Sequence, residues 1–426
     1  MRRAAPRSSQ HGAVIVTVCL LMLFLLGFMG FALDFGRLFV VKSELQTAMD
    51  SCALAAAQEL DSLPDAITRA ANAGMTAGNL NRVNFQSSTW SGQGRIVAGD
   101  VEFMASQAGG FAVTTSAAAA RYARCRHTQP NVQMWLMNAL GAFSGNGAAF
   151  PARRPVQAEA VATRASAQST CPLPLALRPV AGGTAPNYGL AVGQWITLLM
   201  SPGSGSGGQI GWANLDGSNS ASETEHEMNG YCGVTVGTQL GTPGVQSSVA
   251  DAWNARFGIY KNSGGPAANA PDFTGYAYTA NNWPSRANAF NGPTPPGAHA
   301  TAANFVTKRA AYASCANTGT NMNGPNGCKT ITGLTINGGF NTLATPGPTG
   351  QHHQYGASRR IVLVPVVNGT RRVIDYACML MLQPMSIPAA DVQLEYIGNA
   401  GAPASPCTTS GLPGGSAGPL VPVLVR

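Results

Sequence analysis

The run Gly12–Leu33 constrains this chain more than any other feature, because it contains no charged residue. At 1.5 Å per residue, a helix of this length spans roughly 33 Å, which is enough to cross the hydrocarbon core of a bilayer. A buried core helix would be shorter and would carry a polar side, whereas this run is apolar all round. We therefore expect a transmembrane helix over residues 12–33.

A cleaved signal peptide is the alternative interpretation of the same run. Gly30 and Ala32 are small enough to occupy the −3 and −1 positions of a cleavage site. The apolar run is, however, longer than the roughly 7–15 residues of an ordinary signal-peptide core. An uncleaved anchor is therefore favoured over a signal peptide.

The residues that flank the span predict its orientation. Arg2, Arg3 and Arg7 precede it without any acidic residue, whereas the segment that follows mixes basic and acidic side chains. By the positive-inside rule, the tail of residues 1–11 lies in the cytoplasm and the bulk of the chain lies outside it. We expect a single-pass membrane protein; in a bacterial cell the membrane would be the inner membrane, with most of the chain in the periplasm.

Cysteine usage also indicates an oxidising compartment. The sequence has 9 cysteines, of which Cys19 lies in the span, and no C-x-x-C pair is present. Such spacing favours disulfides over a metal site, with eight buried free thiols as the alternative. The connectivity is open, but Cys315 and Cys328 are the best local pair, because the Asn/Gly-rich loop between them has little else to order it. The candidate disulfide cysteines are Cys52, Cys125, Cys171, Cys232, Cys315, Cys328, Cys378 and Cys407.

The apolar helix is expected to continue past the membrane as a stalk over residues 34–60, since apolar and small residues recur there at helical spacing. Its first turn contains Asp34, Gly36 and Arg37, which we interpret as membrane-junction residues. Further along runs a stalk interaction seam of small side chains, which would let a second backbone approach closely. The seam would pack either on a partner protein or on the chain's own first domain, and the sequence supports both equally. Its members are Ala48, Cys52, Ala55 and Ala56.

Beyond the stalk, the pattern predicts an α+β class with antiparallel, β-rich regions and long loops. A first α+β domain is expected over residues 61–165 and a second, β-rich and cysteine-containing domain over residues 166–426. The clearest element is a hairpin whose Asn368-Gly369 link favours a type I′ turn. The expected helices are 64–77, 132–142 and 251–260, the expected strands 95–104, 110–115, 156–163, 194–200, 360–367, 371–383 and 391–397, and the expected loops 202–208, 263–304 and 316–327.

No catalytic, cofactor or metal site is expected. Asp216–Ser220 fits a D-x-S-x-S metal loop, but a Gly/Ser/Asn turn gives the same letters and is favoured. Glu225-His226-Glu227 and His352-His353 lack a partner at metal-ligand spacing, so solvated loops are favoured for them. The net charge of the chain is +8, but its basic residues are scattered and form no stripe, so a nucleic-acid footprint is absent. We also identify no small-molecule substrate.

The N-terminal elements resemble those of a known family. They are a Gly12-Ala13 opening, the apolar span, the junction Asp34-Phe35-Gly36-Arg37, a Leu45-Gln46 pair and an Ala-rich helix that starts near Asp50. In this order they are similar to the TadE/TadG-like membrane domain of TadG-like Flp pilus-assembly proteins, which serve tight-adherence, type IVb pili. Cys52 stands where a small residue, commonly Ala, is usual in that family.

The resemblance implies a bitopic protein without enzymatic activity, whose partners are the inner membrane and other pilus-assembly proteins. The favoured function is therefore a non-enzymatic membrane component that anchors or organises Tad/Flp pilus assembly. A surface adhesin or minor pilus-tip subunit is one alternative. A membrane-tethered periplasmic enzyme is another.

Overall fold

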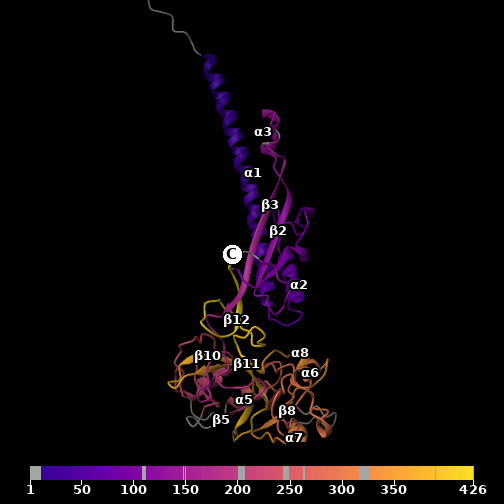
Figure 1. The fold of residues 1–426 in the computed structure, drawn as a ribbon, viewed down its shortest axis with the longest axis vertical. Coiled ribbons are helices and arrows are strands. Elements are labelled where there is room, and N and C mark those ends of the chain that lie inside the picture. The colour runs from indigo at the N-terminus through magenta and orange to yellow at the C-terminus, as the bar shows by residue number, and fades with distance from the viewer. Residues whose placement is uncertain are drawn as a thin grey trace, which may run out of the picture. The chain divides into compact units, whose positions relative to one another are not determined.

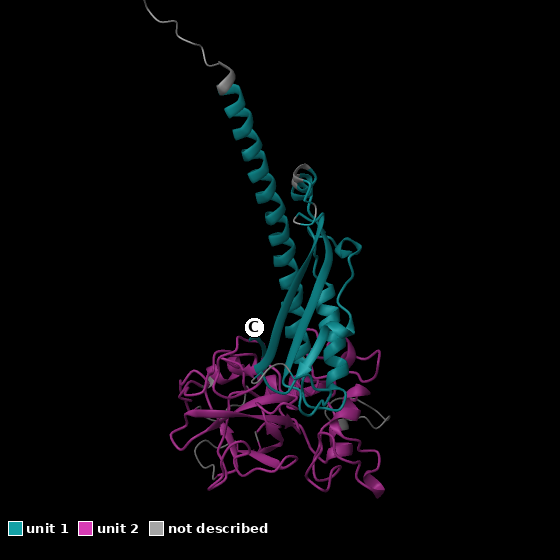
Figure 2. Cartoon of the chain, turned by 45° about the horizontal axis from the view of Figure 1, so that its top comes forward, with its two compact units in different colours: residues 1–164, 422–426 teal, residues 165–421 magenta. Residues whose placement is uncertain are grey.

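The structure is a computed structural model that describes residues 11–425, apart from residues 108–111, 147, 149, 200–206, 243–248, 262–263, 316–325 and 389. The chain divides into two compact units, one of residues 1–164 with 422–426 and one of residues 165–421 (Figure 2). Its class is α+β, with a long N-terminal helix followed by a β-rich region, as the sequence predicts. Nearly all of the predicted tail, and most of the loops predicted over 202–208 and 316–327, lie outside the described residues.

Unit 1 begins with the 48-residue helix α1, His11–Gln58, which Figure 1 shows as one uninterrupted ribbon. Side chains from Val14 to Leu26 are exposed, and the helix is long and apolar enough to cross a membrane by length and composition. From Val41 onward one face is buried, because apolar and small side chains recur there at helical spacing. One helix therefore contains both the exposed apolar run and the central packing element of unit 1.

A sheet with the strand order β1-β2-β3-β12 packs against α1 and α2. β2 pairs antiparallel with β1 and β3, so that Cys125 lies opposite Val101 on one side and Ala160 on the other. Along β3 the buried side chains alternate and are mostly small, which lets the helices approach the sheet closely. The elements after α1 are α2 (Ala66–Asn79), η1 (Trp90–Gly92), η2 (Ala98–Asp100), β1 (Val101–Met104), β2 (Tyr122–Gln133), α3 (Leu136–Ser144), β3 (Arg153–Ser166) and β12 (Leu420–Leu424).

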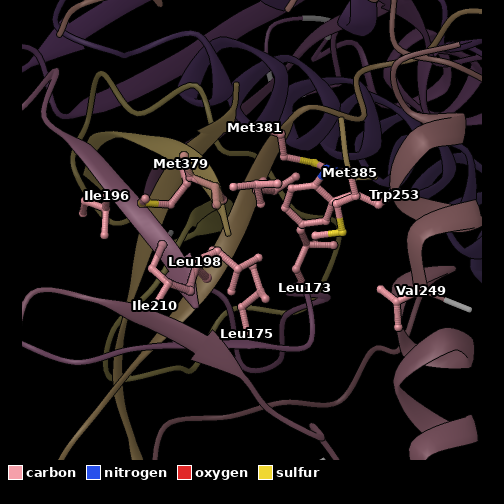
Figure 3. Packing of buried hydrophobic residues seen from close by; sticks show 14 of the residues in the cluster. Leu173, Leu175, Ile196, Leu198, Ile210, Val249, Trp253, Met379, Met381 and Met385 are labelled. Carbon is pink, nitrogen blue, oxygen red and sulfur yellow. The ribbon is translucent and has the colours of Figure 1, made fainter. Parts of the chain in front are cut away.

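Unit 2 is built around a closed barrel with the strand order β10-β11-β5-β6-β4-β9. Figure 3 shows part of its core, where Leu198 and Met379 of the barrel and Trp253 of α5 belong to one buried apolar cluster. A second, two-stranded sheet pairs β7 with β8. The elements are β4 (Leu175–Leu177), β5 (Trp195–Leu199), β6 (Ile210–Trp212), α4 (Ala221–Met228), α5 (Val249–Ala255), β7 (Ile259–Lys261), η3 (Gly297–His299), α6 (Phe305–Ala310), α7 (Asn326–Thr332), β8 (Phe340–Leu343), α8 (Gln351–Gln354), β9 (Ile361–Val367), β10 (Val373–Met381) and β11 (Val392–Asn399).

The predicted hairpin is confirmed as β9 and β10, with β11 as the third strand, but its predicted type I′ turn is wrong. Val367 pairs with Val373, so residues 368–372 connect the strands. Arg371 takes the positive φ of +63°. The Asn368 side chain accepts hydrogen bonds from the N–H groups of Thr370 and Arg372, both at 3.0 Å, and this local bonding favours the wider turn.

Two predicted helices begin or end at other residues than the sequence predicts. Over 132–142, β2 continues to Gln133 and the helix α3 starts only at Leu136. Over 251–260, α5 ends at Ala255 and the chain turns at Gly258, whose φ of +69° ends helical geometry before β7 begins. Trp253 and Phe257 are both buried, as an apolar helix face would be, but they lie on either side of the helix end.

Candidate functional site

The first residue after the apolar run, Asp34, caps another helix of unit 1. Its carboxylate accepts hydrogen bonds from the backbone N–H groups of Trp135, Leu136 and Met137, at 3.2, 2.9 and 2.6 Å. These N–H groups open α3 and have no partner within that helix, so an acceptor from α1 satisfies them and its negative charge complements the helix dipole. Asp34 is only 3% exposed. The junction aspartate therefore fixes the position of α3 on α1.

Arg37, one turn further along α1, lies between two aromatic rings. Its guanidinium carbon is 4.3 Å from the centroid of the Trp135 ring and 5.0 Å from that of Phe85. Cation–π contacts of this kind contribute about 0.5–1 kcal/mol at exposed sites. A groove of about 780 Å³ runs along these residues and is lined mainly by apolar side chains. We call Asp34, Arg37, Phe85, Trp135 and Leu136 the junction site.

Two glycines of α1 differ in what surrounds them. A Cβ placed on Gly30 would lie 2.9 Å from the Cβ of Leu136, so α3 sits directly on the backbone at this position. A Cβ placed on Gly36 would meet nothing within 4 Å. The close approach of α3 thus requires glycine at position 30, whereas the junction residue Gly36 has open space around it.

The stalk interaction seam packs inside unit 1. Ala48, Cys52 and Ala56 are fully buried, whereas Ala55 is half-buried. They face α2, where a Cβ on Gly74 would lie 3.1 Å from the Cβ of Ala56. Of the two alternatives for the seam, packing on the chain's own first domain is the one seen in this structure. The buried residues of α2, which recur every four positions, are Ala66, Ala70, Gly74 and Gly78.

The structure contains four disulfides, which agrees with the predicted oxidising compartment. One of them ties the seam to the sheet, since Cys52 of α1 is bonded to Cys125 of β2. The local pair expected from the sequence, Cys315 with Cys328, is formed. The other pairs are Cys171–Cys232 and Cys378–Cys407, and Cys19 is free and exposed.

The residues singled out as possible metal ligands occupy structural positions, but the expectation of solvated loops is wrong for Glu227 and His352, which are buried on the helices α4 and α8. Asp216 accepts a hydrogen bond from the N–H of Ser218 at 2.8 Å, which closes a turn before α4. His352 is buried with its Nδ1 2.8 Å from the carbonyl oxygen of Asp272, and burial lowers its pKa. His353 is exposed and packs edge-on against Tyr312. Within the described part of the chain, no three His, Cys, Asp or Glu side chains gather as a metal-binding group.

A cavity of about 280 Å³ in unit 2 brings Glu227 and Arg256 together. The Glu227 carboxylate accepts the N–H groups of Leu215 and Asp216 at 2.8 and 3.1 Å, and burial raises its pKa. Arg256 donates to the carbonyl of Met228 at 2.7 Å, and burial lowers its pKa to about 9. Both charged groups are engaged by backbone, so they hold loops together rather than present a reactive group to the cavity.

Comparison with known proteins bears on α1. Residues 12–59 match the model of a family described as putative Flp pilus-assembly TadE/G-like. This part of the chain is similar to the TadE/G-like family, and we call residues 12–59 the TadE/G-like segment. The match confirms the resemblance seen in the sequence, over nearly the bounds of α1. It supports a role in pilus assembly.

The TadE/G-like segment contains Asp34, Arg37 and the seam, so the family match and the junction site coincide on one helix. Neither the curated proteins nor the solved structures that were compared include a match to this chain.

Sequence reasoning missed the α3 half of the junction site. Trp135 and Leu136 are 62% and 41% exposed. The signal in the sequence that could have indicated them was the apolar run Met134–Met137 at the end of the β2–β3 hairpin. It also missed the partner of the seam on α2. Gly74 and Gly78, four residues apart on one helix face, have the spacing of a close helix contact and could have been recognised from it.

Proposed function

We propose that this chain is a non-enzymatic, single-pass component of Tad/Flp pilus assembly that anchors or organises the machinery at the inner membrane. The observation that carries the proposal is the TadE/G-like match over residues 12–59. The family suggests a pilus-assembly role and interaction with other pilus components. The bulk of the chain would lie in the periplasm, where four disulfides are stable.

Unit 1 supports an anchoring role because the anchor and the fold share one helix. α1 passes from its exposed apolar run into the buried core of unit 1 without an interruption. The disulfide between Cys52 and Cys125 and the packing of α2 hold that helix against the sheet. A displacement of the membrane segment would therefore move unit 1 as a body, as an anchor requires.

The orientation is tested on the full chain by cysteine accessibility. In a Cys19→Ser background, Leu63→Cys places a thiol at an exposed position just beyond α1, and Ser9→Cys places one in the N-terminal tail. A membrane-impermeant maleimide should label Leu63→Cys in intact spheroplasts and Ser9→Cys only after lysis. The reverse pattern would overturn the proposed orientation, and labelling of Leu63→Cys in a soluble fraction would overturn the anchor.

The assembly role is tested by deletion. Loss of the gene should abolish surface Flp pili, and the full-length protein should restore them while fractionating with the inner membrane. Cross-linking in intact cells should join the chain to other pilus-assembly proteins. Recovery of the chain in sheared pili would favour a pilus-tip subunit instead, and normal piliation of the deletion strain would contradict the proposal.

A further inference from the structure

The end of the β2–β3 hairpin lies level with the apolar run of α1. We define the hairpin tip as residues Met134–Gly145, which include α3. The contact of Leu136 with Gly30 and the cap by Asp34 place the first turn of α3 beside the last turn of the expected span. Figures 1 and 2 both show α3 at the end of the hairpin, beside the part of α1 that precedes the sheet. These contacts with α1 therefore set how deep the hairpin tip lies relative to the bilayer that α1 is expected to cross.

The exposed side chains of α1 indicate where this helix would leave the apolar interior of the membrane. Phe35 and Phe39 are exposed, although both follow the last residue of the expected span. Val41 is buried, and Lys42 is the first exposed charged side chain beyond them. If the membrane boundary lies near this change from exposed apolar to exposed charged side chains on α1, the hairpin tip lies on the membrane side of that boundary.

The composition of the hairpin tip fits that depth. No Asp, Glu, Lys or Arg occurs between Met134 and Ala152. Trp135, Leu136 and Ala139 are exposed, so the tip presents apolar side-chain surface outside the buried core of unit 1. A helix satisfies its own backbone hydrogen bonds, which is what an apolar environment requires. Trp is also enriched at the boundary between the headgroups and the acyl chains.

Two exposed arginines, Arg153 and Arg154, lie directly behind the hairpin tip. In the β2–β3 register they are opposite Gln133 and Val132, the residues that precede the tip. Cationic side chains near a membrane surface attract anionic headgroups. An uncharged apolar tip followed by two arginines is the order that a lipid surface would recognise.

We infer that the hairpin tip is a second membrane contact, which inserts the exposed side chains around Trp135 into the headgroup–acyl boundary of the bilayer that α1 crosses. The inference rests on the anchoring part of the proposed function. It assigns a lipid surface, rather than a partner protein, to this apolar face, because the face is continuous with the membrane span. The contact would fix the rotation of unit 1 about the axis of α1, since α1 alone would leave that rotation free.

The test places an environment-sensitive nitrobenzoxadiazole label on single cysteines of the full-length Cys19→Ser protein. Ala139→Cys reports on the tip and Asn138→Cys repeats the measurement one residue away, both at exposed positions. Leu23→Cys reports on the span, and Leu63→Cys is an exposed apolar position at the far end of α1. The protein is reconstituted in vesicles of phosphatidylcholine and phosphatidylglycerol that contain lipids with a nitroxide near the glycerol end of the acyl chain. Mass spectrometry of each variant should show the four disulfides intact.

Both tip labels should be quenched several-fold more strongly than the label at Leu63 and at least as strongly as the label at Leu23, whose mid-span position lies deeper in the bilayer than the nitroxide. Quenching at Leu23 without quenching at either tip position would overturn the tip inference and leave the anchor intact. Absence of quenching at all positions would overturn the anchor itself. Blue-shifted emission at the tip without quenching would indicate a protein contact and would also overturn the lipid assignment.

Discussion

The Asp34 carboxylate lies 2.6 Å from the backbone nitrogen of Met137, although 103 residues separate them in the chain. The bond joins the residue that follows the apolar run to a helix at the end of a hairpin. The aspartate of the TadE/G-like junction thus has a structural role in this chain that a solvated interfacial residue would not have. The junction site is a packed contact inside unit 1.

Asp34→Asn should loosen α3. The amide keeps the size of the side chain but loses its charge and one acceptor oxygen, and a negative charge at a helix N-terminus typically contributes about 0.3–2 kcal/mol. Hydrogen exchange of residues 136–144 should accelerate by roughly 2–30-fold, with the sheet unchanged. The matched control is Asp50→Asn, because Asp50 accepts a hydrogen bond from Gln46 on the same helix, at 2.8 Å, and caps no other helix among the described residues. Equal acceleration in both variants would contradict the capping role.

Gly30→Leu and Gly36→Leu should have different effects, although both add the same side chain to α1. At position 30 the new Cβ would collide with Leu136, so α3 must move and its cap must weaken. At position 36 there is open space. Hydrogen exchange in α3 should therefore rise only for Gly30→Leu. If Gly36→Leu loosened α3 as much, the contact between Gly30 and Leu136 would not be what positions the helix.

Ala56→Leu should destabilise unit 1 by about 1–3 kcal/mol, because the larger side chain overpacks the contact with Gly74. Asn72→Leu on the exposed side of α2 is the matched control and should change the free energy of unfolding by less than about 0.5 kcal/mol. Thermal unfolding in detergent measures both. An unchanged unfolding temperature together with a lost cross-link to a pilus protein would mean that the seam faces a partner.

The disulfide between Cys52 and Cys125 closes a sequence separation of 73 residues. In the chain-entropy account, a loop of this size contributes about 4 kcal/mol. The double variant Cys52→Ala/Cys125→Ala should therefore unfold at a markedly lower temperature. Cys19→Ser removes the free thiol of the apolar run and should leave the unfolding temperature unchanged. Equal stability of the double variant and the parent chain would refute this contribution.

Unit 2 should lose stability as the pH rises toward neutrality. Glu395 is 1% exposed and accepts N–H groups of Ala289 and Phe290, and burial raises its pKa from 4.5 to about 7. Its contribution is fully present below pH 4.5, the unfolded value, and is lost as the pH rises through 7. The expected loss is on the order of 3 kcal/mol.

Thermal unfolding of the parent chain and of Glu395→Gln between pH 4.5 and 8 measures this loss. The variant should have a flatter profile, because its amide does not titrate. The buried His352 titrates in the opposite sense, since its lowered pKa makes acid destabilising, but it is present in both proteins and cancels in their difference. Parallel profiles for the two proteins would contradict the assignment to Glu395.

Local patterns in the sequence predicted the elements whose causes are local. The uninterrupted α1, the β9–β10 hairpin and the pair Cys315–Cys328 each follow from residues that are close together in the chain. The start of α3 was misplaced because its cap comes from Asp34, far away in the sequence. The closed barrel was not predicted because its shortest strands, β4 and β6, are too short to show an alternating pattern.

The junction site was predicted in half for the same reason. Asp34 and Arg37 were identified from their place after the apolar run, whereas Phe85 and Trp135 reach them only through tertiary packing. A buried cation in unit 2 is the clearest example of a feature that local sequence cannot predict. Arg360 is fully buried, and its guanidinium donates to the carbonyls of Thr274, Tyr276 and Met381 at 2.7–3.0 Å. Nothing in its sequence neighbourhood distinguishes it from an exposed arginine.

The strands β3 and β12 are neighbours in one sheet, and unit 2 is the stretch of chain between them. Where the chain leaves and returns, the N–H of Ala167 donates to the carbonyl of Pro419 at 3.0 Å. Mechanically, unit 2 is thus tethered by two adjacent strands rather than hung from one. A pull on unit 2 would therefore load both strands at once.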